Sequence, residues 1–256
     1  WHTQCTLNDL CKPNRMKRIF KKIGFCLLPF LLIAIISFAA VNDDVFNDSL
    51  IAGKPIPVIT DSMLNASYNM LAKQFGENKI MPAGYEKQVL FALSYFPELA
   101  HTSITFKIVK STGGIISTRP FIGSLLRSSS KRSYLVVIND STEGRSMPTW
   151  LNCGINGQIG ILGHELSHII YFSKQTGLGL LGLGVAHISR SYMDRFENKT
   201  DSVDIERGLG YQLIAWNQYL QKYFRPMNPD FTPQPDKPDA HERYMSIGFI
   251  GLRGKI

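Results

Sequence analysis

Residues 164–168 read His-Glu-Leu-Ser-His, and this short run constrains the fold more than any other part of the chain. Apolar residues flank the run on both sides at helical spacing: Ile159, Ile161, Leu162, Ile169, Ile170 and Tyr171. Residues four apart lie on the same face of an α-helix, so His164 and His168 can direct their imidazole rings toward one ion. The sequence therefore predicts a largely apolar helix over residues 157–173 that carries a metal-binding face.

The spacing of these residues is typical of a hydrolytic zinc site. Imidazole nitrogens bind zinc at about 2.0–2.1 Å, and zinc lowers the pKa of water at an open coordination position toward about 7. Glu165 follows His164 directly, so it can face that water, take its proton and deliver it to a leaving amine. With six histidines and eight glutamates in the chain, such a run is expected by chance about 0.004 times. The alternative interpretation is a pair of ordinary histidines on a buried helix.

Two histidines do not complete the site, because catalytic zinc takes three protein ligands. In the metzincin class of zinc peptidases, a glycine follows the second histidine by three residues and a third histidine follows it by six. Tyr171 and Lys174 occupy those positions here, so that class is excluded. Cys153, upstream of the helix, is a second candidate for the third ligand; its alternative role is that of a small buried hydrophobe.

Glu197 is the third candidate, and the spacing favours it. Glu197 and Asp201 are four residues apart on a predicted helix, so a ligating carboxylate is followed by one that can orient a histidine. The intervening residues are enough to bring this helix back against the first. A thiol at position 153 would have to fold back along about 10 Å of helix to reach the ion. The alternative for Glu197 and Asp201 is a solvated acidic face.

The order of the predicted elements gives the fold class. Hydrophobic residues make up 44% of the chain and charged residues 19%, which is typical of a globular domain. Helices are expected before and after a small mixed sheet, which defines an α+β fold. The expected helices cover residues 61–76, 84–96, 157–173, 188–204 and 207–223, and the expected strands cover 103–109, 134–139 and an edge strand near 115–119. The glycine-rich run 177–184 is interpreted as a mobile apolar loop, with a lid or a membrane-touching patch as the alternatives.

The N-terminal part of the chain has the features of a targeting segment. Basic residues at 17, 18, 21 and 22 precede an uncharged apolar run over residues 23–41, and Ser37-Phe38-Ala39 has the small-x-small pattern of a cleavage site. The run is also about long enough to span a membrane. A cleaved signal peptide and a retained anchor, through which residues 23–41 would associate with the membrane, therefore both stay open.

In either case residues 42–256 are expected to be exported to the periplasm or cell envelope, and a retained anchor would hold them at the inner membrane. The expected layout is an upstream or non-native segment over 1–15, the targeting segment over 16–41, a linker over 42–58 and one domain over 59–256.

The net charge of +8 does not indicate a nucleic-acid partner. Residues 1–39 hold six basic residues and one acidic residue, which leaves 22 basic and 19 acidic residues in the rest of the chain. That balance is typical of an ordinary solvated surface, so nucleic-acid binding is not expected. The oligomeric state is not indicated.

The motif and the downstream acidic pair together resemble the gluzincin metallopeptidases. The closest likeness is to the group that includes the CAAX prenyl-protein proteases and the bacterial heat-shock membrane proteases, and it covers about residues 156–205. The resemblance implies a zincin-like fold with zinc bound by His164, His168 and Glu197, Glu165 as the general base and Asp201 supporting a ligand. Thr200 stands where that group usually has alanine.

A zinc-dependent endopeptidase acting on peptide or protein substrates is therefore the expected function. Tyr244 and His241, near the C-terminus, are candidates for the group that stabilises the oxyanion. A non-catalytic envelope binding protein on the same fold and a zinc hydrolase of a non-peptide amide are the alternatives.

Overall fold

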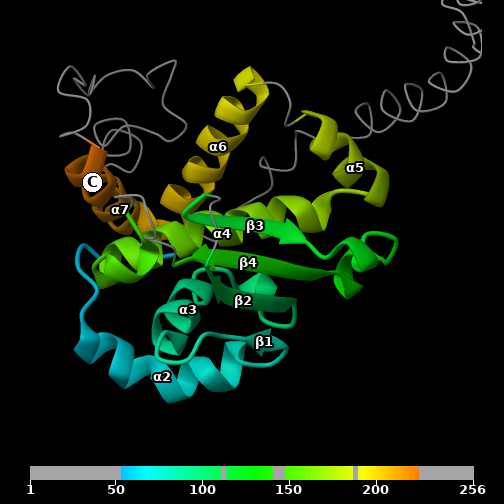
Figure 1. Cartoon of the computed structure of the whole chain (residues 1–256). Coiled ribbons are helices and arrows are strands. Elements are labelled where there is room, and N and C mark those ends of the chain that lie inside the picture. The colour runs from blue at the N-terminus through cyan, green and yellow to red at the C-terminus, as the bar shows by residue number, and fades with distance from the viewer. Residues whose placement is uncertain (1–52, 111–113, 141–147, 187–189, 225–256) are drawn as a thin grey trace, which may run out of the picture.

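The computed structural model describes residues 53–110, 114–140, 148–186 and 190–224 (Figure 1). The expected targeting segment lies outside these ranges. Within them the fold is α+β, with a small mixed sheet and mostly helical content, as the sequence predicts. No helix in the described part of the chain is both long and apolar enough to cross a membrane.

Four strands form the sheet, in the order β1-β2-β4-β3. Strands β1 and β4 run parallel to β2, and β3 pairs antiparallel with β4 and lies at the edge. The strands are β1 (Lys79–Ile80), β2 (Ser103–Val109), β3 (Ile116–Pro120) and β4 (Ser133–Asn139). The two long strands and the edge strand lie where the sequence predicts them, whereas the two-residue β1 is too short to leave a pattern.

Buried side chains alternate with more exposed ones along the two central strands, β2 and β4, and cover one face of the sheet. Ile104 and Phe106 of β2 pair with Tyr134 and Val136 of β4, and all four are buried. Because successive side chains of a strand point to opposite faces, these residues lie on the same side. They join one continuous core with the surrounding helices.

Two helices precede the sheet. Helix α2 spans Asp61–Phe75, and the Thr60 hydroxyl caps it by accepting a hydrogen bond from the backbone amide of Met63 at 3.3 Å. Helix α3 spans Glu86–Leu93 and is shorter than predicted, because a 3₁₀ turn over Pro97–Leu99 follows it.

Helix α4 (Ile155–Lys174) is the central element, and every residue from Gly157 to Phe172 is buried. One face of α4 packs on α7 (Gly210–Phe224), where a side chain at Gly160 would collide with the backbone of Gln212. Its other face meets α6 (Arg190–Asp204), as the contacts described below show. The helix predicted to carry the histidines is therefore held between two others.

The glycine-rich run is a helix, so the prediction of a loop over 177–184 is wrong. Helix α5 spans Gly177–Ala186, and Thr176 caps it by accepting a hydrogen bond from the amide of Gly179 at 3.0 Å. Glycine costs about 1 kcal/mol per position in a helix, which favours a loop on propensity alone. Burial of Leu180 and Leu183 in the core outweighs that cost.

A π-helical turn over Ile205–Leu209 joins α6 to α7, with Gly208 at a φ of 98°. The buried Arg207 pairs here with Glu98 and also donates to the carbonyl of Tyr95 at 2.8 Å. The amide of Gly53 donates to the Arg207 carbonyl at 3.1 Å, so the last residues of the predicted linker lie along this turn.

Candidate metal centre

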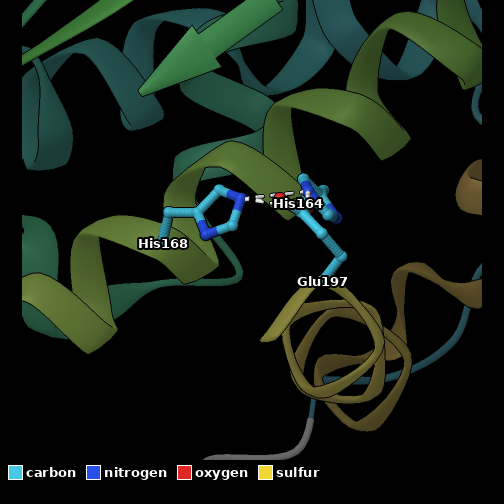
Figure 2. Close-up of side chains that lie close together, drawn as sticks. All are labelled: His164, His168 and Glu197. Carbon is cyan, nitrogen blue, oxygen red and sulfur yellow. Dashed lines mark hydrogen bonds and ion pairs between the residues drawn. The ribbon is translucent and has the colours of Figure 1, made fainter. Parts of the chain in front are cut away.

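Three side chains from α4 and α6 direct ligand atoms at one point (Figure 2). His164 and His168 project from α4, and Glu197 projects from α6. All three are buried, and their candidate ligand atoms lie within 4.8 Å of one another. The helical spacing of the two histidines and the return of α6 against α4 thus bring together the three residues that the sequence suggested as ligands.

The separations of these atoms fit a tetrahedral ion. The two Nε2 atoms are 3.1 Å apart, Glu197 Oε2 is 3.0 Å from His164 Nε2, and it is 3.5 Å from His168 Nε2. Bonds of 2.0–2.1 Å at tetrahedral angles place neighbouring ligand atoms about 3.3 Å apart. The donor set, two imidazoles and one carboxylate, is one that zinc accepts, although other divalent transition metals also bind such ligands.

The opposite ring nitrogens have partners that set the tautomers. His164 Nδ1 lies 2.7 Å from Asp201 Oδ1, so it donates its proton to that carboxylate. His168 Nδ1 lies 3.4 Å from Thr200 Oγ1, and the Thr200 hydroxyl itself donates to the Phe196 carbonyl at 2.9 Å. The Thr200 oxygen therefore accepts from His168. Both Nε2 atoms are left with lone pairs that point toward Glu197, which is the arrangement a cation needs.

Burial and neighbouring charges have opposite effects on the pKa values of His164 and Glu197. Burial disfavours a charged His164, but hydrogen bonds to Asp201 and Glu197, and their negative charges, outweigh it and raise the pKa of His164 well above its usual value. Burial likewise opposes the charge of Glu197, and the two histidines outweigh it and lower the pKa of that carboxyl. Without an ion, a proton shared among these groups offsets the negative charge, and a cation can take its place.

Glu165 follows His164 directly in α4, and its side chain is 3% exposed. Within the described residues its Oε2 has no hydrogen-bond partner. A buried carboxylate oxygen without a partner is costly unless something else uses it. Glu165 thus retains a free acceptor next to His164, which is what the predicted general base requires.

The structure places Cys153 elsewhere. Its side chain lies at the N-terminal end of α4, next to Gly157, and burial raises the pKa of its thiol to about 12. It is not among the residues that could share a metal in the described part of the chain. Tyr244 and His241, the candidates for oxyanion stabilisation, lie outside the described residues.

Two further residues of the site, Phe196 and Asp204, were not singled out from the sequence, and Thr200 was noted only as a departure from the resembled group. The Phe196 ring stacks on His168 with centroids 5.0 Å apart, Thr200 contacts the same histidine, and Asp204 lies against Gly163. A signal was present: positions 197, 200, 201 and 204 follow the i, i+3, i+4, i+7 pattern of one helical face. A polar stripe of this kind indicates a buried site once a neighbouring helix is known to carry ligands.

Asp204 is the least satisfied of these residues. It is fully buried, and within the described residues neither of its carboxylate oxygens has a hydrogen-bond partner. Burial raises the pKa of Asp204 well above its usual value and the charge of Asp201 adds to this, while His164 and Arg207 oppose it. The side chain is therefore held closer to its neutral form than an exposed aspartate would be.

Comparison with known proteins identifies no relative: no family model matches the chain, and no curated protein or solved structure matches it significantly.

Proposed function

We propose that this protein is a zinc-dependent peptidase of the zincin type. The observation that carries the proposal is the convergence of His164 Nε2, His168 Nε2 and Glu197 Oε2, with both histidine tautomers set by Asp201 and Thr200. The adjacent Glu165, with its unpartnered carboxylate oxygen, adds the base that hydrolysis needs. The sequence resemblance to the gluzincins agrees with this donor set.

The roles of the residues follow from their positions. His164, His168 and Glu197 would hold the ion, which when bound polarises the scissile carbonyl and lowers the pKa of water. Glu165 accepts a proton from the attacking water and later delivers it to the nitrogen of the leaving amine, as the C–N bond breaks. Asp201 and Thr200 keep the imidazoles oriented throughout.

The edge of the sheet offers a place for the substrate. Strand β3 pairs with β4 on one side only and packs beside α4, while Ser117 and Arg119 alternate as its exposed residues. An extended peptide can add to such an edge through main-chain hydrogen bonds. We therefore expect an extended stretch of polypeptide as the substrate. The basic and apolar segment over 16–41 is the reason to expect the enzyme in the cell envelope.

The experiment is a hydrolysis assay on the full chain. Zinc-loaded protein is incubated with a random peptide library, and new N-termini are identified by mass spectrometry, with Glu165→Gln and Glu77→Gln compared with wild type. Glu77 is an exposed glutamate far from the ligands in sequence, so its variant should cleave normally. Glu165→Gln should retain zinc and lose at least about 10³-fold in kcat/KM.

Three other outcomes would overturn the proposal. Stoichiometric zinc without cleavage by any variant would favour a binding protein. Undiminished cleavage by Glu165→Gln would place the chemistry elsewhere. Cleavage of non-peptide amides in place of peptides would define a different hydrolase.

A further inference from the structure

Five large apolar side chains are exposed on two segments at the end of α4. Phe121, Ile122 and Leu126 are 41%, 84% and 99% exposed, and Leu178 and Leu181 of α5 are 51% and 49% exposed. We call these five residues the apolar patch. Single exposed apolar residues need no explanation, but a group of them on adjoining segments marks an interaction surface.

The two segments lie side by side. A side chain on Gly177 would come within 2.8 Å of the Leu125 carbonyl oxygen, so the start of α5 touches the turn that carries Leu126. Arg132 fixes the same junction, because its guanidinium donates to the carbonyls of Phe172 and Gln175 at 3.2 and 2.6 Å. Figure 1 shows α5 beside the connection between β3 and β4.

Internal hydrogen bonds hold the turn over residues 121–127 in place. The Ser124 hydroxyl donates to the Phe121 carbonyl at 2.7 Å and accepts from the amide of Ser133 at 3.2 Å. The amide of Arg127 donates to the Ser124 carbonyl at 3.0 Å. Ile122 and Leu126 are thus displayed on an ordered backbone, and their exposure does not follow from a frayed loop.

Helix α5 has no charged residue, and only part of its apolar surface is covered. Leu180 and Leu183 face the core, whereas Leu178 and Leu181, also three residues apart, face outward. A helix that is apolar on all sides is normally buried in protein or in contact with lipid. In the described part of the chain its outer face is therefore exposed, although the helix is apolar on all sides.

The two stretches of chain that carry the apolar patch contain no acidic residue. No Asp or Glu occurs between Glu98 and Asp140, or between Glu165 and Asp194. Within the first of these stretches Arg127 and Lys131 are exposed, next to Leu126. Apolar side chains bordered by basic residues and free of acidic ones are complementary to a surface with an apolar interior and anionic headgroups.

We propose that the apolar patch docks the protein on an anionic phospholipid bilayer. The side chains of the five residues would enter the boundary between headgroups and acyl chains, while Arg127 and Lys131 contact lipid phosphates. The patch lies beyond the C-terminal end of α4, about 10 Å along the helix from His168. This contact is separate from any association through residues 23–41, and it does not depend on the proposed catalysis.

The test places a fluorescent reporter at the patch in the full chain. Leu126→Trp and Leu181→Trp are compared with Ile80→Trp, a matched control at an apolar residue of β1 that is 65% exposed. Emission of the native tryptophans, present in every variant, is subtracted. The probe is a vesicle of phosphatidylglycerol and phosphatidylethanolamine with brominated acyl chains, which quench tryptophan only on contact.

Quenching of the reporters at 126 and 181 by at least about twofold, with none at 80, is the expected result. Arg127→Glu and Lys131→Glu should each raise the lipid concentration at half-maximal quenching about fivefold. Equal quenching at all three positions would show that residues 23–41 alone bring the protein to lipid, and equal quenching by phosphatidylcholine would show that charge is not recognised; either result overturns the proposal. Blue-shifted emission before lipid is added would also overturn it, since the patch would then be covered by protein.

Discussion

The two faces of α4 pack against their neighbouring helices in different ways. Toward α7 the helix presents glycines, and at Gly160 the two backbones approach so closely that no Cβ fits. Toward α6 it presents His164 and His168, whose rings meet Glu197 between the helices. Long polar side chains converge between α4 and α6 and bring three candidate ligand atoms together, whereas at Gly160 there is no room for a side chain between α4 and α7.

The two interfaces also differ in how their polar groups are satisfied. Near α7 the side-chain amide of Gln212 donates to the Asn156 side chain of α4 at 3.1 Å and to the Ile56 carbonyl at 2.8 Å. Near α6 the outer ring nitrogens of both histidines have partners, while the inner ones converge. Substitutions toward α7 should therefore cost stability, and substitutions toward α6 should cost metal affinity.

The largest expected effect is loss of a ligand. Glu197→Ala removes one of three donor atoms, and zinc affinity should fall by more than the about 10–100-fold that a supporting residue costs. Cys153→Ser is the matched control on the α7 side, and its zinc affinity should be unchanged because the thiol lies away from the ligands. Competition with a chromophoric chelator measures both. Loss of zinc from Cys153→Ser alone would contradict the assigned ligand set.

Removal of a residue that orients a histidine should lower zinc affinity, but by less than removal of a ligand does. Asp201→Ala deprives His164 of the carboxylate that sets its tautomer, so zinc affinity should fall about 10–100-fold. Thr200→Ala should have a smaller effect, since its contact with His168 is longer. The same chelator titration applies. If Thr200→Ala weakened zinc binding more than Asp201→Ala, the assignment of the two histidine tautomers would need revision.

Substitutions where α4 contacts α7 should change the free energy of unfolding more than zinc affinity. Gly160→Ala forces the backbones of α4 and α7 apart and should lower the free energy of unfolding by about 1–3 kcal/mol. Gly184→Ala, in α5, meets nothing within 4 Å and should raise it by about 0.5–1 kcal/mol through helix propensity. Urea unfolding followed by circular dichroism measures both, and the same sign for the two would contradict the close approach at Gly160.

The smallest expected effect is a change in how the free energy of unfolding depends on pH. The pKa of Asp204 is raised in the fold relative to about 3.9 in the unfolded chain, so its contribution is full below that pH and is lost as pH rises through the folded pKa. Asp204→Asn removes this loss. In chelator-treated protein its stability advantage over wild type should therefore grow from pH 4 upward. Urea midpoints across the pH range test this, and an advantage that shrinks with pH would contradict it.

Much of the fold could be predicted because apolar residues recur at helical or strand spacing along most of its elements. Helix α2 ends one residue before the predicted end, and the strands over 103–109 and 134–139 are found within one residue of their predicted bounds. Helix α5 was missed because local propensity favours a loop at its glycines, and only the distant core that covers Leu180 and Leu183 reverses this. The short strand β1 depends on its neighbour β2 in the same way.

The candidate ligands could be predicted from spacing alone, but their surroundings could not. His164 and His168 share a face by helical geometry, and Glu197 needed only a chain reversal. The contact of Thr200 with His168 depends on how α6 is rotated against α4, which no local pattern specifies. The burial of Asp204 against Gly163 depends on the same rotation.

We propose that α4 and α6 hold one metal ion, and elemental analysis of the purified full chain measures this ion itself. After equilibration with zinc and removal of free ion, wild-type protein should retain one zinc ion per chain through His164, His168 and Glu197. The double variant His164→Ala/His168→Ala should retain none while keeping its helical circular dichroism. Full zinc occupancy in the double variant, or none in the wild type, would contradict the account.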